Sequence, residues 1–99
     1  MNYVNDFIKD YILYYSKELM PSMEVIFSQD KIATEKEAKD CLQFIELMCD
    51  QCIIDVKENK TILDSPASSH HAEKATMVIE DFIEDSGFDY LIDNDLELE

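Results

Sequence analysis

Residues 34–52 constrain the fold more than any other part of the chain. They open with a capping box, Thr34-Glu35-Lys36-Glu37, in which we expect the Thr34 hydroxyl to accept from the Glu37 N–H and the Glu37 carboxylate to accept from the Thr34 N–H. Apolar residues then recur at spacings of three and four, which places them on one face of a helix. They are Ala38, Cys41, Leu42, Ile45, Met48, Cys49 and Cys52.

Two other segments share this helical period. Residues 3–20 carry an apolar stripe that Pro21 ends, and another stripe follows the small polar stretch 65–71 and stops at Ser86 and Gly87. Gly87 is the only glycine of the chain and suits a left-handed C-terminal cap. The stripe residues are Val4, Ile8, Tyr11, Tyr15 and Leu19 in the first segment, and Ala72, Ala75, Met77, Val78, Ile79, Phe82 and Ile83 in the second.

Three segments between these helices favour strands. Residues 23–28 are short and rich in β-branched and aromatic side chains, which is typical of a strand. Residues 53–57 and 61–64 flank three polar residues, which indicates a β-hairpin with its turn at 58–60. Residues 88–92 fit either a last strand or a short helix. The order α-β-α-β-β-α, plus this open last element, predicts an α+β fold of three helices and a small, mostly antiparallel sheet.

The length of 99 residues fits one domain. We expect this α+β domain to span residues 1–92 and an acidic C-terminal tail to occupy residues 93–99. A hydrophobic content of 46% is enough for a packed core and too high for a wholly disordered chain.

The charge balance excludes several classes of partner. The chain has 23 acids against eight lysines and no arginine, and its net charge is -15. Such a field repels polyanions, so we expect neither direct nucleic-acid binding nor binding to an anionic membrane. The apolar runs are far shorter than the ~20 residues of a membrane span, and the first residues lack a basic signal region. Three cysteines, an odd number, agree with a reducing compartment, so we expect a cytoplasmic protein.

The acids are unevenly distributed along the sequence. Residues 1–74 hold all eight lysines, whereas residues 75–99 hold nine acids and no base. Acids near a helix C-terminus oppose the helix dipole, and like charges at i,i+4 repel. A solvated, solubilising surface is the simplest interpretation. The functional interpretation is a partner-binding surface made of Glu80, Asp81, Glu84, Asp85, Asp89, Asp93, Asp95 and Glu97.

These carboxylates repeat at about 5.4 Å on successive helical turns and about 6.6 Å on an extended segment, close to the step between backbone phosphates. In size, charge and absence of arginine the chain resembles the small acidic DNA-mimic inhibitors of bacteriophages. The resemblance implies a role in host takeover: blocking the nucleic-acid site of a basic DNA-binding host protein. The implied partners are a histone-like nucleoid protein, RNA polymerase, or a nuclease such as a CRISPR effector, met in the host cytoplasm.

Other motifs point to packing rather than chemistry. Cys49 and Cys52 form a Cys-x-x-Cys pair at the end of a helix, where the dipole disfavours a thiolate, so we expect buried, inert thiols. The adjacent His70 and His71 miss the spacing of zinc ligands and are expected to be exposed. Residues 93–99 begin like a calcium loop but lack its glycine. We therefore expect no catalytic, metal or cofactor site, and a protein that is not an enzyme.

Two further functions remain open. One is an immunity or antitoxin protein that neutralises a cognate basic toxin, and the other is an acidic adaptor that acts through an apolar helix face. Tyr14 points away from the stripe of its helix and is expected to be exposed, as in an interface. The chain is expected to be a monomer or a small homo-oligomer.

Overall fold

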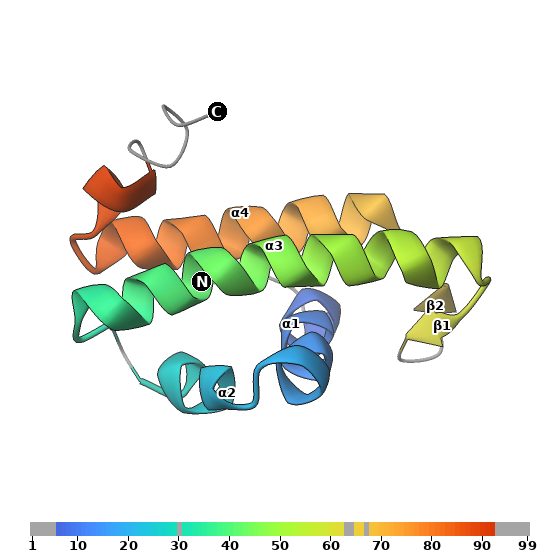
Figure 1. Ribbon diagram of the computed structural model, residues 1–99, viewed down its shortest axis with the longest axis horizontal. Helices are drawn as coiled ribbons and strands as arrows, with labels where there is room; N and C mark the ends of the chain where they lie inside the picture. Colours follow the sequence, from blue (N-terminus) through green and yellow to red (C-terminus); the bar gives the residue numbers. More distant parts are fainter. Residues whose placement is uncertain (1–5, 30, 63–64, 67, 93–99) are drawn as a thin grey trace.

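The computed structural model describes residues 6–29, 31–62, 65–66 and 68–92. Within these residues the chain is mostly helical. Two long antiparallel helices lie side by side, with the N-terminal part of the chain packed beneath them (Figure 1). The helices are α1 (Asp6–Leu19), α2 (Ser22–Phe27), α3 (Glu35–Lys57) and α4 (Ser69–Asp85).

The α+β prediction is wrong. In the described residues the only strands are β1 (Thr61–Ile62) and β2 (Ser65–Pro66), which pair antiparallel in the connection between α3 and α4. Strands of two residues bury no face of a sheet, so they close a loop rather than build a layer. The molecule is a small helical globule.

The strand predicted over residues 23–28 is instead the helix α2. Pro21 has helical dihedral angles (φ -56°, ψ -27°) and starts the turn. Met23 and Ile26, three residues apart, are both buried against the core, whereas Val25 is 65% exposed. Residues 6–29, 31–62, 65–66 and 68–92 offer this segment no strand to pair with, and tertiary packing of its helical face overrides its β propensity.

The hairpin predicted over residues 53–64 is also wrong. Residues 53–57 continue α3, because Cys52 and Asp55 lie on its buried face and hold the last turns against α1. Residues 58–60 end that helix. Asn59 has a positive φ of 59°, and the N–H groups of Asn59 and Lys60 donate to the carbonyls of Val56 and Asp55. This is the Schellman pattern, in which asparagine replaces the usual glycine.

The three predicted helices are confirmed over the described residues. The Thr34 hydroxyl accepts from the Glu37 N–H at 3.1 Å, as the capping box requires. The Glu37 carboxylate accepts from the Ala33 N–H at 2.9 Å rather than from Thr34. Gly87 has φ 90°, and its N–H and that of Phe88 donate to Glu84 and Ile83, so α4 ends in the expected left-handed cap. Residues 89–92 then form a helical turn.

Every helix contributes to one core. Tyr11 and Tyr15 are buried as predicted, and Phe44 of α3 is a buried residue that the predicted stripe omitted. Met77, which the stripe included, is 59% exposed. The core consists of Ile8, Tyr11, Ile12, Tyr15, Met23, Ile26, Ile32, Ala38, Cys41, Phe44, Met48, Cys52, Ala72, Ala75, Ile79, Ile83 and Ile92. The expected tail at 93–99 lies outside the described residues.

Candidate functional site

Four of the predicted partner-binding residues lie on the last two turns of α4. Asp81, Glu84 and Asp85 are exposed and Glu80 is half-buried. We call these four residues the acidic α4 face. Glu80 and Glu84 are one turn apart on one flank of the helix, and Asp81 and Asp85 occupy the adjacent flank. No basic residue lies in the last turn of α4, so these charges stand unopposed at the negative end of the helix dipole.

The lysines of the described residues do not neutralise this face. Every ion pair in this part of the chain lies on α1, α2, α3 or the connection after α3. The pairs are Lys17–Glu24, Lys36–Asp40, Lys39–Glu35, Lys60–Asp55 and Lys60–Glu58. The acidic α4 face therefore keeps its charge exposed to solvent or to a partner.

Glu80 differs from the other three acids in its environment. Burial, followed by the neighbouring Glu84 and Asp81 carboxylates, raises the pKa of Glu80 above its ordinary value. The charge of Glu80 is thus partly desolvated, and no cation among the described residues pairs with it. A basic group brought by a partner would relieve this cost.

The other predicted partner-binding residues lie beyond α4. Asp89 is exposed on the helical turn 89–92. Its neighbour Tyr90 donates a hydrogen bond of 2.8 Å to Glu35, which ties this turn to the start of α3. Asp93, Asp95 and Glu97 lie outside the described residues, so the structure brings together five of the eight predicted positions along one end of the α4 segment.

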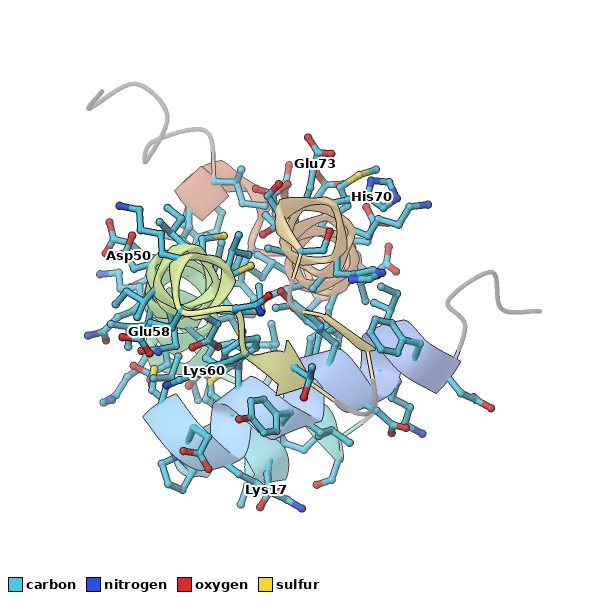
Figure 2. All side chains as sticks on the ribbon, turned by 90° about the vertical axis from the view of Figure 1, so that its right-hand side faces the viewer. Lys17, Asp50, Glu58, Lys60, His70 and Glu73 are labelled. Carbon is cyan, nitrogen blue, oxygen red and sulfur yellow. The ribbon has the colours of Figure 1, made fainter. Side chains whose placement is uncertain are left out.

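A groove between α3 and α4 was not anticipated from the sequence. It has a volume of about 520 Å³, and Figure 2, which looks along the two helices, shows Glu73 on its α4 side pointing away from α1. Ile53 of α3 is 53% exposed and Met77 of α4 is 59% exposed. The groove is lined by Cys49, Cys52, Ile53, Ser69, Ala72, Glu73, Thr76, Met77 and Glu80. An apolar residue on a helical stripe is normally read as core, which is why the exposure of Met77 was missed.

A second hollow, of about 650 Å³, lies between α1, α2 and α4. Its charged lining is mixed, because Lys9 stands among Asp6 and Glu24. The apolar part comes from residues such as Phe27 and Phe82, which are half-buried against the core. This hollow gathers no cluster of one chemistry.

A buried polar cluster joins α1 to the end of α3. The Tyr15 hydroxyl donates to Asp55 at 2.7 Å, and the Gln51 amide donates to the other carboxylate oxygen at 3.0 Å. Lys60 adds a more distant ion pair at 3.9 Å. Burial, followed by the bond to Asp55, raises the pKa of Tyr15 above its ordinary range. These contacts hold α1 against the last turns of α3, so the cluster acts in packing.

The cysteines and histidines do not converge on a site. Cys41 and Cys52 are buried as expected, with burial raising the pKa of Cys41 to about 12, and Cys49 is half-buried. Cys52 donates to the Ser68 carbonyl at 3.3 Å. His70 is exposed, but His71 is half-buried because its ring packs on Phe7 with 4.5 Å between centroids. Among the described residues no three potential ligands are grouped for a metal ion.

Within the part of the chain that the structure describes, each helix is too short or too polar to cross a lipid bilayer. No family model, curated protein or solved structure matches the chain.

Proposed function

We propose that the protein is an acidic DNA mimic, which binds the basic nucleic-acid-binding surface of a partner protein and blocks it. The acidic α4 face, continued by Asp89, makes the contact. The partner is a basic DNA-binding protein of a bacterial host, such as a histone-like nucleoid protein, RNA polymerase or a nuclease. The encounter takes place in the host cytoplasm, where the three free thiols of the chain remain reduced.

One observation carries the proposal: four carboxylates occupy two successive turns of α4, and none has a cation partner among the described residues. Their two flanks give rows of charge with a repeat of about 5.4 Å. A groove that binds nucleic acid presents lysine and arginine at similar intervals, so it is able to accept these rows in place of phosphates.

The cost of this arrangement supports a binding role. Acids at a helix C-terminus and like charges one turn apart both lower the stability of the helix. Solubility alone is served equally well by acids at helix N-termini, where the dipole favours them. The position of the acidic α4 face therefore favours selection for binding over selection for stability.

The experiment is capture of proteins from a nuclease-treated bacterial lysate on the immobilised chain, followed by elution with duplex DNA. The nuclease removes nucleic acid that would bridge the bait to other proteins. We expect nucleic-acid-binding proteins to be retained and then released by duplex DNA at constant ionic strength. Retained proteins that resist duplex DNA, or that have no nucleic-acid site, would contradict the proposal.

A second candidate is an immunity or antitoxin protein, and the exposure of Met77 beside the acids favours it. A surface that binds the phosphate backbone makes mainly charged and polar contacts, whereas a cleft in a toxin enzyme offers apolar as well as basic contacts. In this case the captured protein would be an enzyme whose catalytic activity is inhibited by the chain, with or without a nucleic-acid substrate.

A further inference from the structure

The groove between α3 and α4 is lined mainly by apolar and small side chains, which suits packing of a third helix. Its floor is formed by small side chains, such as those of Ala72 and Thr76, which allow another backbone to approach closely. Ile53 forms one wall and Met77 the other, and each leaves more than half of its surface exposed. From Ser69 to Glu80 the groove follows α4 for about 16 Å, which is the length of three helical turns.

The charge of the groove restricts what binds there. Two of its lining residues, Glu73 and Glu80, are acids, and none is basic. In Figure 2 Glu73 stands clear of the neighbouring helices, and no ion pair involves it in the described part of the chain. Glu80 is half-buried, and Glu73 and Glu80 lie one helical turn before and after Met77. An apolar side chain flanked by two acids is complementary to an apolar stripe bordered by lysine or arginine.

The same charges disfavour a second copy of this chain and an anionic membrane as occupants. A symmetric dimer across this groove would bring Glu73 and Glu80 of both copies together, between two chains of net charge -15 each. An anionic lipid surface repels the same net charge. A basic amphipathic segment of a partner protein is complementary both to the apolar side chains of Ile53 and Met77 and to the acids beside Met77.

We propose that the α3–α4 groove binds an amphipathic helix of a partner protein, which packs apolar side chains against Ile53 and Met77 and sets basic side chains beside Glu73 and Glu80. This goes beyond the proposed function, since it adds an apolar anchor to the charged contact. The anchor supplies affinity that salt does not screen, whereas the acidic α4 face supplies attraction that salt weakens.

The test uses two synthetic 14-residue peptides as probes. Both carry leucine at i, i+4, i+7 and i+11, and they differ only in having lysine or glutamate at the flanking positions. Binding is followed by NMR of the methionine methyl groups of the full chain. We expect the lysine peptide to shift the Met77 methyl resonance, while the buried Met23 and Met48 respond little and the glutamate peptide has no effect.

Matched variants distinguish peptide binding in the groove from general electrostatic attraction to the acidic chain. Ile53→Ser with Met77→Ser should weaken the lysine peptide by about tenfold or more, at low and at moderate salt. Glu73→Gln with Glu80→Gln should weaken it about threefold to tenfold at low salt and less at moderate salt. Val25→Ser removes an equally exposed apolar side chain from α2 and should leave binding unchanged. Circular dichroism checks that each variant is folded.

The outcomes discriminate between occupants. An unmoved Met77 resonance, or equal binding by the serine variants and the wild type, would overturn the proposal. A concentration-dependent dimer that Met77→Ser abolishes would assign the groove to a second copy and overturn it as well. If a captured partner tolerates the serine variants but loses affinity when the acidic α4 face is neutralised, the groove assignment fails and the proposed function stands.

Discussion

At Asp55 a carboxylate lies inside a helical core, only 4% exposed, and nearby donors compensate for its loss of water. Tyr15 and Gln51 each satisfy one carboxylate oxygen. A buried charge without such partners is costly, so each donor matters more than an average hydrogen bond. The three residues come from α1 and from the last turns of α3, and they therefore fix how these helices cross.

Tyr15→Phe tests this contact. The substitution keeps the ring in the core but removes the hydroxyl donor from a buried carboxylate. We expect the free energy of unfolding, measured by urea denaturation, to fall by about 1.5–3 kcal/mol. Tyr14→Phe is the matched control, because Tyr14 is exposed as predicted, and it should change stability little. Equal effects of the two substitutions would contradict the role given to Asp55.

Glu80→Gln tests the partly desolvated carboxylate of α4. Burial and like charges raise the folded-state pKa of Glu80 above the ordinary value of 4.5. At pH values between 4.5 and this raised pKa, Glu80 keeps its proton in the folded state but has lost it in the unfolded state. The contribution of Glu80 to stability therefore falls as pH rises through that window and stays unfavourable at pH 7.

Neutralising Glu80 should raise stability at pH 7 by about 0.2–0.5 kcal/mol, as expected for relief of a like-charge pair. The gain should vanish near pH 3, well below the ordinary glutamate pKa, where Glu80 is protonated in both the folded and the unfolded state. Urea denaturation at both pH values measures it, with Glu18→Gln in α1 as the control. A gain that persists at low pH would show that the effect is not electrostatic.

At the scale of elements, the end of α4 combines a good backbone cap with unfavourable charges. Gly87 closes the helix in a Schellman motif, while the acidic α4 face opposes the helix dipole. The backbone of this helix is already well capped, so substitutions that remove its unfavourable charges should stabilise it. Such substitutions commonly reduce function when the unfavourable groups belong to a binding surface.

Asp81→Asn, Glu84→Gln and Asp85→Asn together should stabilise the protein by about 1 kcal/mol, since they remove charges from the negative end of the dipole. In a domain of this size that corresponds to a rise of about 5 °C in Tm, measured by circular dichroism. The matched control neutralises the same residue types on α1, with Asp6→Asn, Asp10→Asn and Glu18→Gln. Because Asp6 lies in the first turn of α1, its loss should offset the gain from removing Glu18 in the last turn, so this control should bring no comparable net gain. A loss of stability in the α4 variant would contradict the unfavourable charge placement.

The elements differ in how far the sequence predicted them. Long segments with clear caps were predicted correctly, because the Thr34 hydroxyl and Gly87 are local signals that determine where a helix begins or ends. The structure of the short apolar segments was not predicted correctly. Residues 23–28 and 53–57 have strand-like composition, and only packing against the core made them helical, so no local pattern was able to reveal it.

The candidate site was also predicted only in part. The charge asymmetry identified the acids of α4 because it is a property of the sequence itself. The groove depends on how α3 and α4 lie against each other, and it includes Met77, which helical periodicity assigns to the core. The seven apolar residues predicted for the α4 stripe cover more of the helix surface than its contacts with α1 and α3 bury, so Met77 stays exposed.

At the scale of the whole molecule, the dominant feature is a net charge of -15 on a compact chain with a Cα radius of gyration of 13.2 Å. Charge of one sign destabilises the compact state by self-repulsion and keeps copies apart. It also attracts basic proteins over a range set by the ionic strength, about 10 Å at 0.1 M salt.

The melting temperature should therefore rise by several degrees as NaCl increases from about 0.02 to 0.3 M at pH 7, because the salt screens repulsion between carboxylates. Near pH 4, where many carboxylates are protonated, the rise should be smaller. A thermal melt series at the two pH values measures both effects. A flat or falling curve at pH 7 would show that the acids do not repel one another appreciably.

The most direct measurement is displacement of fluorescent duplex DNA from a captured partner, titrated in parallel with the wild type, the α4 triple variant and the α1 triple variant. The two variants have lost the same number of charges from the same residue types. If the acidic α4 face substitutes for nucleic acid, the α4 variant should need at least tenfold more protein for half-displacement, while the α1 variant should match the wild type within about twofold. Equal losses in both variants would show that net charge alone drives binding, and would contradict a DNA-mimicking surface on α4.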